Sequence, residues 1–348
     1  MTTDPRPAPS PVLSPALSIV APCFDEAAGL AAFHERASDA ARGTVGASYE
    51  IVLVNDGSRD ETWEVIQSLC DADPHVVGID LSRNHGHQLA LTAGLSACRG
   101  GRVLIIDADL QDPPELLGAM WTKADEGADV VYGRRTARAG ETWFKRATAS
   151  LFYRTLRKLT ATDIPADTGD FRLMSRRAVD TLASMPERFR FVRGMVAWIG
   201  LPQAEVPYER DARHAGETGY GLAKMLGLAL DAVTGFSIVP LRLAVGASVV
   251  TGAAGLVALA ATIGAHLAGS TLPGWTSIAC LVLVMGSLQL AVLGVMSEYL
   301  GRMYVEAKGR PLFVVREVIR SNAQAAADGP ARTMQDALHE RIKVALNG

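Results

Sequence analysis

The feature that most constrains this chain is a long segment without a charged side chain. From Leu243 to Ser297, 55 residues, there is no Asp, Glu, Lys or Arg. A helix needs about 20 apolar residues to cross roughly 30 Å of hydrocarbon, so the segment is long enough for two crossings. Between them, Gly269 to Gly274 contains the Gly and Pro that favour a turn. The sequence therefore predicts membrane-spanning helices over 239–268 and 275–298. The alternative is a helical hairpin buried in a soluble core.

Basic side chains flank the uncharged segment on both sides. Arg242 precedes it, and Arg302, Lys308 and Arg310 follow it, whereas the turn between the predicted spans has no Lys or Arg. Because cytoplasmic loops carry the excess of Lys and Arg, both ends of the chain are predicted to lie in the cytoplasm. The expected location is the inner (cytoplasmic) cell membrane, in a multi-pass topology.

The regions on either side of the spans mix apolar and charged residues. Residues 217–238 and 299–321 are predicted to form interfacial helices that lie along the inner leaflet. Residues 1–15 are Pro-rich and are expected to be a disordered leader, and residues 322–348 to be a polar cytoplasmic tail. The cytoplasmic domain is then expected to span residues 16–216.

Apolar runs in this domain alternate with helical segments. Strands are expected at residues 17–22, 50–54, 76–81 and 102–106. This alternation predicts an α/β domain built on a parallel sheet, with ligands bound beyond the carboxyl ends of the strands. The net charge of −3 gives no general attraction to nucleic acid. Neither a dinucleotide-binding nor a P-loop glycine motif follows a strand.

Asp107-Ala-Asp109-Leu-Gln111 follows the fourth apolar run. Alternate residues of extended chain point the same way, so these three side chains offer oxygen ligands on one face. Such ligands suit Mg²⁺ or Mn²⁺ bound to a diphosphate. The alternative, an acidic strand end that caps a helix, is the preferred interpretation for Asp112, which begins a capping-box pattern that ends at Glu115.

Two further segments carry polar residues that point to a ligand. Asn55-Asp56-Gly57-Ser58 ends the second apolar run, and Asp56 is a candidate for binding a ribose or a base, with plain turn chemistry as the alternative. Between Arg134 and Lys158 lie eight basic residues and one acidic residue. This run indicates an anionic partner, with a solvated helix face as the alternative.

Six motifs occur in an order that resembles a known family. They are Pro22-Cys-Phe-Asp-Glu26, Asn55-Asp-Gly-Ser-Arg-Asp-Glu-Thr62, Arg83-Asn-His-Gly-His-Gln88, Asp107-Ala-Asp-Leu-Gln-Asp-Pro-Pro-Glu115, Asp167-Thr-Gly-Asp-Phe-Arg-Leu173 and Glu298-Tyr-Leu-Gly-Arg-Met-Tyr304. Together they resemble the polyprenyl-phosphate glycosyltransferases of glycosyltransferase family 2, relatives of dolichyl-phosphate mannose synthase. The resemblance implies a GT-A catalytic domain with a Rossmann-like mixed sheet. It also implies inverting transfer of a sugar from a nucleotide diphosphate to a polyprenyl phosphate.

The resemblance also implies roles for individual residues. A nucleotide pocket with metal and diphosphate sites is expected at Pro22, Phe24, Glu26, Asp56, Asp107, Asp109 and Gln111. The acceptor phosphate is expected at Arg135, Arg146 and Ser150, and the reacting centre at Asp109, Asp170 and Arg172. One departure is Gly219, where the family usually has Lys.

The expected partners are a nucleotide-diphosphate sugar, an undecaprenyl or decaprenyl phosphate and the lipid bilayer, but no nucleic acid. UDP-glucose is the default donor by family frequency, and the family also implies a homo-oligomer, with a tetramer as one form. Two alternatives stay open: a processive polysaccharide synthase, and an inactive membrane scaffold or sugar-nucleotide sensor. No glutamine begins the Gln-x-x-Arg-Trp motif in which the processive enzymes resemble one another.

Overall fold

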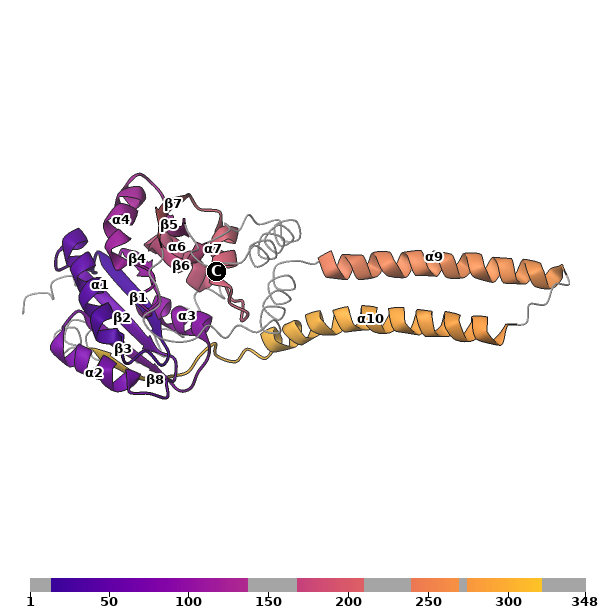
Figure 1. Cartoon of the computed structure of the whole chain (residues 1–348), viewed down its shortest axis with the longest axis horizontal. Helices are drawn as coiled ribbons and strands as arrows, with labels where there is room; N and C mark the ends of the chain where they lie inside the picture. The colour runs from indigo at the N-terminus through magenta and orange to yellow at the C-terminus, as the bar shows by residue number, and fades with distance from the viewer. Residues whose placement is uncertain (1–13, 137–167, 210–238, 269–273, 321–348) are drawn as a thin grey trace, which may run out of the picture. The chain divides into compact units, whose positions relative to one another are not determined.

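The computed structural model describes residues 14–136, 168–209, 239–268 and 274–320 (Figure 1). The described chain divides into two compact units. One unit holds an eight-stranded sheet with its helices, and the other holds two long apolar helices. Arg146, Ser150 and Gly219, together with the predicted helix over 217–238, lie outside the described residues.

The sheet has the strand order β7-β5-β6-β4-β1-β2-β3-β8. Its strands are β1 (Leu17–Cys23), β2 (Tyr49–Asn55), β3 (Val76–Leu81), β4 (Arg102–Ile105), β5 (Val130–Arg135), β6 (Thr168–Ser175), β7 (Gln203–Tyr208) and β8 (Val315–Arg320). The strands β3, β2, β1 and β4 are parallel, while β6 pairs antiparallel with β4 and β5, and β8 antiparallel with β3. The sheet is therefore mixed, with a parallel core.

Helices cover both faces of this sheet. They are α1 (Leu30–Val45), α2 (Thr62–Ala72), α3 (His87–Ala97), η1 (Pro114–Leu116), α4 (Leu117–Asp125), α6 (Arg176–Ser184) and α7 (Val192–Ile199). Helices α1, α2 and α4 pack together over one face, and α3, α6 and α7 over the other. Every residue of β1, β2 and β3 is buried, which explains why these strands are mostly apolar. Polar residues such as Asp56 follow the strands at their carboxyl ends.

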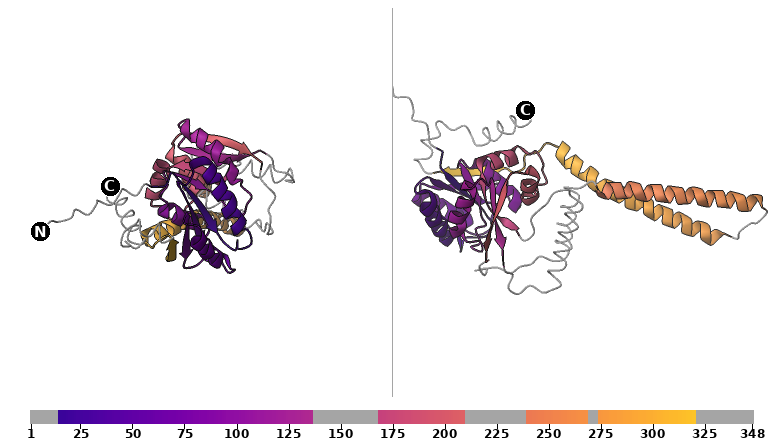
Figure 2. Two further views of the ribbon diagram at one scale, coloured as in Figure 1. Left: turned by 90° about the vertical axis from the view of Figure 1, so that its left-hand side faces the viewer. Right: turned by 90° about the horizontal axis from the view of Figure 1, so that it is seen from above.

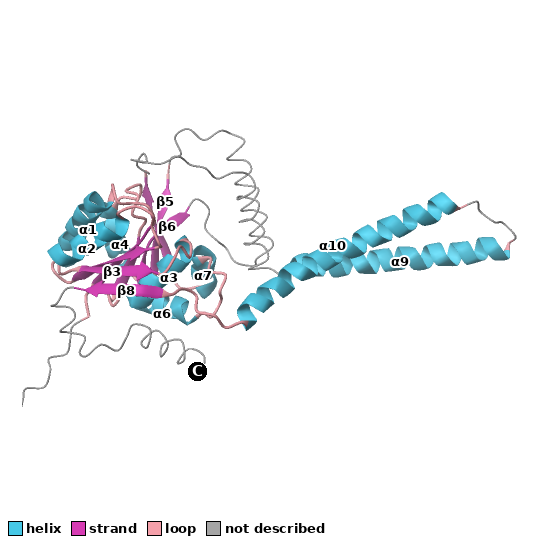
Figure 3. Ribbon diagram, turned by 90° about the horizontal axis from the view of Figure 1, so that it is seen from below, coloured by secondary structure: helices cyan, strands magenta, loops and turns pink. Residues whose placement is uncertain are grey.

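Strand β8 corrects the helix predicted over 299–321. Helix α10 (Trp275–Ala307) ends before Gly309, which has a φ of +60°, and residues 315–320 then pair along β3 (Figure 3). Gly in a left-handed conformation followed by Pro is a usual helix stop. The β-branched residues of 315–320 favour extended chain, and β3 offers an unpaired edge. The sheet is thus completed by a segment that follows the apolar helices in the sequence.

The second unit contains α9 (Val239–Leu267) and α10, which run side by side in opposite directions (Figure 2). Both are long and apolar enough to cross a membrane, over Val239–Ala261 with mean hydropathy 2.0 and over Val284–Ala307 with mean hydropathy 1.2. Only 6% and 0% of these windows are buried within the chain. Core helices of a soluble protein would be mostly buried, so this pattern favours the membrane prediction over the buried hairpin.

Candidate functional site

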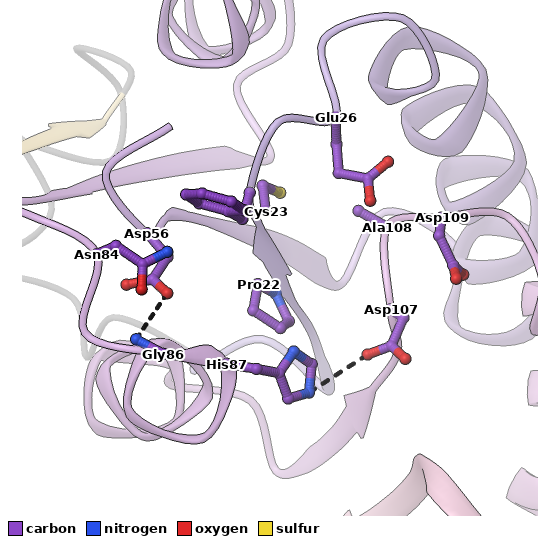
Figure 4. Close-up of a pocket in the computed structure, with 11 residues that line it drawn as sticks. Pro22, Cys23, Glu26, Asp56, Asn84, Gly86, His87, Asp107, Ala108 and Asp109 are labelled. Carbon is purple, nitrogen blue, oxygen red and sulfur yellow. Dashed lines mark hydrogen bonds and ion pairs between the residues drawn. The ribbon is translucent and has the colours of Figure 1, made fainter. Parts of the chain in front are cut away.

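A pocket opens at the carboxyl ends of β1, β2 and β4, the place expected for a ligand of a parallel sheet. Asp56 and Asn84 lie at one end of it, and Glu26 and Asp109 at the other (Figure 4). Its lining consists of Pro22, Cys23, Phe24, Glu26, Asp56, Asn84, Gly86, His87, Asp107, Ala108 and Asp109. Six of the seven residues predicted for the nucleotide and metal are among them. The seventh, Gln111, is buried and lies outside this lining.

The loop after β1 is tied to the loop after β2. The amide of Asp25 donates to Ser58 Oγ at 3.1 Å, and Asp25 Oδ1 accepts from the amide of Arg59 at 2.8 Å. Asp25 has a φ of 56°, a left-handed conformation that non-glycine residues adopt only where their surroundings enforce it. These bonds fix the chain just before Glu26. They leave Phe24 40% exposed beside the pocket, where an aromatic ring is available for stacking on a base.

Asp56 joins the β2 loop to the loop after β3. Its Oδ1 accepts from the amide of His85 at 2.7 Å and its Oδ2 from the amide of Gly86 at 2.9 Å. Burial raises the pKa of Asp56, and these two amide bonds act against that rise. The sequence assigned Asp56 to the nucleotide. The structure shows that it also holds the loop carrying Asn84, so one side chain shapes two walls of the pocket.

Gly57 lies where these loops touch, and we expect Gly57→Ala to weaken nucleotide binding by roughly tenfold or more. Its φ is +65°, and an added Cβ would lie 2.5 Å from the backbone of Arg83 and Asn84. Gly200 is a matched control, because its φ of +71° is similar but an added Cβ meets nothing nearer than 3.9 Å. Calorimetry with UDP should therefore detect a loss for Gly57→Ala but not for Gly200→Ala. Equal affinities in the two variants would contradict the close approach of the loops.

Asp107 and Asp109 follow β4 and face the pocket. Asp107 Oδ1 is buried and accepts no hydrogen bond from the described residues, and His87 Nε2 lies 3.5 Å from it. Burial raises the pKa of Asp107 to about 6, and repulsion from Asp170, Asp112 and Asp109 adds to the rise. Two carboxylates held together at such a cost are suited to a hard divalent cation.

The backbone conformation of this acidic loop also determines where its side chains lie. Leu110 has a φ of 60°, and the amide of Gln111 donates to Asp109 Oδ1 at 3.1 Å. The left-handed residue turns the chain, so Gln111 does not continue the extended alternation that predicted three ligands on one face. No group of three His, Cys, Asp or Glu side chains able to hold a metal occurs among the described residues. Asp107 and Asp109 offer two carboxylates that suit a metal, and the metal ligand roles of Asp107, Asp109 and Gln111 stay predictions.

Asp170 is the centre of a buried polar network beside the pocket. Its carboxylate accepts from Gln88 Nε2 at 3.0 Å and from Arg193 Nε at 3.0 Å, and His87 Nε2 lies 3.3 Å from it. Burial would raise the pKa of Asp170, but the bond from His87 and the charges of Arg193 and Arg172 hold it well below its usual range. The carboxylate is therefore ionised in the folded protein.

Arg172 is a buried member of this network. Its side chain is only 4% exposed, and its Nη2 donates to the carbonyl of Gly169 at 2.9 Å and lies 3.7 Å from Asp170 Oδ1. Burial lowers the pKa of the Arg172 guanidinium to about 10, which leaves it charged at neutral pH. Its burial and its contact with Asp170 suggest a positioning role for Arg172.

Sequence reasoning missed His87, Gln88 and Arg193. His87 Nε2 lies 3.5 Å from Asp107 Oδ1 (Figure 4) and 3.3 Å from Asp170 Oδ2. These two carboxylates raise its pKa in spite of its burial. The available signal was that His87 and Gln88 lie in the loop and helix start that follow the third apolar run, on the same side of the sheet as Asp56 and Asp107.

Arg135 ends β5 and is held by two side chains. Its Nε donates to Tyr208 Oη at 3.1 Å, and its Nη2 lies 3.6 Å from Asp112 Oδ1, which also accepts from the Tyr208 hydroxyl. Asp112 is therefore buried between β5 and β7 and is not the helix cap that the sequence predicted, because the ionic partner outcompetes a backbone amide. The helix at Pro114 begins without a side-chain cap.

Comparison with known proteins identifies glycosyltransferases as relatives. The model of "Glycosyl transferase family 2" matches residues 18–183. The chain is 45% identical over 301 residues to the "Uncharacterized glycosyltransferase YkcC" of Bacillus subtilis (strain 168), which covers 86% of this chain and 93% of the relative. It is 36% identical over 303 residues to the "Prophage bactoprenol glucosyl transferase homolog" of Escherichia coli (strain K12), covering 87% of this chain and 99% of the relative.

Solved structures are similar at lower identity. Glucosyl-3-phosphoglycerate synthase from Mycobacterium tuberculosis, in complex with Mn²⁺, UDP and phosphoglyceric acid, is 19% identical, with a TM-score of 0.45, over 63% of this chain and 76% of that chain. S. aureus TarS in complex with UDP-GlcNAc is 15% identical, with a TM-score of 0.45, over 63% of this chain and 65% of that chain. The described residues confirm the expected mixed α/β sheet and two long apolar helices.

Proposed function

The chain belongs to glycosyltransferase family 2, and we propose that it transfers a sugar from a nucleotide-diphosphate sugar to a polyprenyl phosphate. The observation that carries the proposal is the pocket in which Asp56 and the Asp107–Asp109 pair lie at the ends of parallel strands. The acceptor is supported by the bactoprenol glucosyl transferases, which match nearly their full length to this chain at 36% identity. For the same reason we take glucose as the sugar and UDP-glucose as the donor.

The nucleotide end of the pocket binds the donor. Phe24 supplies an exposed ring for the base, while Asp56 and Asn84 shape the wall around the nucleoside. Asp107 and Asp109 hold Mg²⁺ or Mn²⁺, which when bound neutralises charge on the leaving diphosphate. In this proposal the sugar–phosphate bond lies beyond the ends of β1 and β4, next to His87 and Asp170.

The acceptor needs little activation. A phosphate monoester has a second pKa of about 6, so its oxygen is already largely ionised at neutral pH. The main task of the protein is to align two anions for in-line attack at the anomeric carbon. Arg135, together with Arg146 and Ser150, holds the acceptor phosphate in our proposal. Asp170 orients His87 and Arg193 at the reacting centre, and Arg172 positions Asp170.

The two apolar helices anchor the enzyme in the inner membrane in our proposal. Their length, hydropathy and low burial support this role. Arg242 in the first turn of α9, and Lys308 and Arg310 after α10, put both flanks in the cytoplasm by the positive-inside rule. The catalytic domain then works at the inner leaflet, where a polyprenyl phosphate presents its head group. We further propose that the chain forms a homo-oligomer.

The proposal is tested by incubating membranes that contain the protein with a panel of radiolabelled nucleotide sugars. We expect label from one of them, UDP-glucose by default, to enter the organic-extractable lipid fraction as a mild-acid-labile phosphodiester. A control membrane without the protein corrects for resident enzymes. Label that appears only in a polymer would instead support the processive synthase, and no transfer from any donor would support the scaffold or sensor.

Arg135→Ala is expected to raise the apparent Michaelis constant for polyprenyl phosphate by roughly tenfold to a hundredfold, because a charge-assisted arginine–phosphate contact contributes about 1.5–3 kcal/mol. UDP affinity should stay nearly unchanged. Arg135→Lys restores the positive charge but not the bidentate hydrogen bonding of the guanidinium. It should therefore recover only part of the activity. Arg134→Ala is the matched control, because the guanidinium of the neighbouring Arg134 pairs with the exposed Glu205. Loss of UDP affinity with an unchanged lipid dependence would move Arg135 into the donor pocket.

A further inference from the structure

Strand β8 brings one arginine to the carboxyl end of β3. Arg316 Nη1 donates to Asp80 Oδ2 at 2.8 Å, and Arg316 Nη2 donates to the carbonyl of Ser82 at 3.0 Å. The segment before it is also fastened there, because the amide of Ser82 donates to the carbonyl of Val314 at 2.9 Å. The strand is therefore joined to the start of the loop that runs from β3 into the pocket.

Asp80 connects Arg316 to the loop after β2. The Asp80 side chain is only 1% exposed, whereas Arg316 is 61% exposed, so the guanidinium is the solvated partner of a buried carboxylate. The other oxygen, Asp80 Oδ1, accepts from Asn55 Nδ2 at 2.8 Å. Without the guanidinium, the buried Asp80 carboxylate would lack its cation, and this cost favours a shift of the carboxylate toward solvent. Such a shift would move the acceptor that holds the Asn55 amide.

Asn55 in turn sets the turn at the base of the pocket. Its Oδ1 accepts from the amide of Ser58 at 3.1 Å, and Ser58 Oγ accepts from the amide of Asp25 at 3.1 Å. Between Asn55 and Ser58 lies Asp56, whose carboxylate binds the amides of the β3 loop at 2.7 and 2.9 Å. Arg316 thus connects to both loops that form the nucleoside wall: through Asp80 to one, and through Ser82 to the other.

We propose that Arg316 is a positioning residue for the nucleotide-binding half of the pocket. Arg316 is not among the residues that line the pocket, and it acts through Asp80 and Ser82, which orient the loops carrying Asp56 and Asn84. Its role in catalysis rests on the proposed function. Its role in ordering the two loops does not rest on that function, so the ordering role and the catalytic role are measured separately.

The first measurement is hydrogen–deuterium exchange of the purified full-length protein in detergent. Arg316→Ala is expected to speed exchange in peptides covering 55–58 and 82–86, and Arg316→Lys to restore part of the protection. Arg320→Ala is the matched control on the same strand, because Arg320 pairs with Val77 at the opposite end of β3. Unchanged exchange in both peptides of Arg316→Ala, or an equal change in Arg320→Ala, would overturn the proposal.

The second measurement is kinetic, with whichever nucleotide sugar the wild type uses. Arg316→Ala should raise the Michaelis constant for this donor by about tenfold, with the turnover number and the Michaelis constant for polyprenyl phosphate nearly unchanged. A merely structural defect would instead lower the amount of active enzyme and leave both constants as they are. That outcome would overturn the positioning role. Failure of the wild type to transfer any sugar would count against the proposed function, and the exchange result would still decide the role of Arg316.

A double-mutant cycle tests the route through Asp80. Asp80→Asn keeps the shape of the side chain and removes its charge, so Arg316 loses its ionic partner. If Arg316 acts through Asp80, the double variant Asp80→Asn/Arg316→Ala should raise the donor Michaelis constant little more than Arg316→Ala alone. Effects that multiply would show that the two residues act independently and would contradict this route.

Discussion

Asp109→Asn is expected to lower sugar transfer by roughly a hundredfold to a thousandfold, the usual loss when one electrostatic contributor to a transition state is removed. Asp109 lines the pocket beside Asp107, and the variant keeps its shape while halving the charge of the pair. Wild-type transfer should likewise stop in EDTA and recover with Mg²⁺ or Mn²⁺. The measurement is the rate at which label enters the lipid fraction as the metal concentration is varied.

Asp125→Asn is the matched control, because Asp125 is an exposed carboxylate on α4 that pairs with Arg102. It should keep wild-type activity and the wild-type metal dependence. If Asp109→Asn in EDTA works as well as the wild type with Mg²⁺, the assignment of Asp107 and Asp109 to a metal is wrong. If only Asp107→Asn abolishes transfer, Asp109 has no place in the site.

Asp170→Asn is expected to damage both activity and stability. The carboxylate faces His87, Arg193 and Arg172 and is only 6% exposed. Its removal leaves buried positive charge uncompensated, which costs about 3–5 kcal/mol and should lower the unfolding temperature by roughly 6–20 °C. Thermal unfolding in detergent, followed by intrinsic fluorescence, measures this shift. Transfer should fall at least as far as for Asp109→Asn, because His87 and Arg193 lose their common anchor.

Asp180→Asn provides the comparison for this variant. Asp180 is exposed on α6 and faces Arg176 at 3.5 Å, so its removal should shift the unfolding temperature by a degree or two at most. An Asp170→Asn protein that unfolds like the wild type would contradict the buried network. A protein that is destabilised but fully active at low temperature would confine Asp170 to a structural role.

Much of the pocket could be predicted because each strand is a buried apolar run with a polar end. Asp56, Asp107 and Asp109 follow such runs directly, and parallel strands bring these ends to one edge. Gln111 could not be placed in this way, since the left-handed Leu110 breaks the alternation on which its prediction depended. Asp170 entered only through the resemblance, because β6 runs antiparallel and carries it in from a distant part of the sequence.

Strand β8 is the segment of the sheet for which the sequence predicted a helix, while β5, β6 and β7 were not predicted as strands. The charged residues of 315–320 fit a helix at a membrane surface, but its β-branched residues and the open edge of β3 together favour the extended form. Asp112 shows the same limit. Its neighbours predicted a helix cap, but Arg135 and Tyr208, from two other strands, provide stronger partners. Both errors arise where a long-range contact outweighs a local preference.

The late position of β8 in the sequence imposes an order on biosynthesis. A ribosome completes both apolar helices before it reaches residue 315, so the edge of β3 has no partner throughout the synthesis of α9 and α10. Unpaired strand edges are where nascent chains aggregate or recruit chaperones. A nascent chain stalled within these helices would leave this edge exposed, while a completed chain pairs it with its own strand. Strand β8 can therefore complete the sheet only after α9 and α10 have been synthesised.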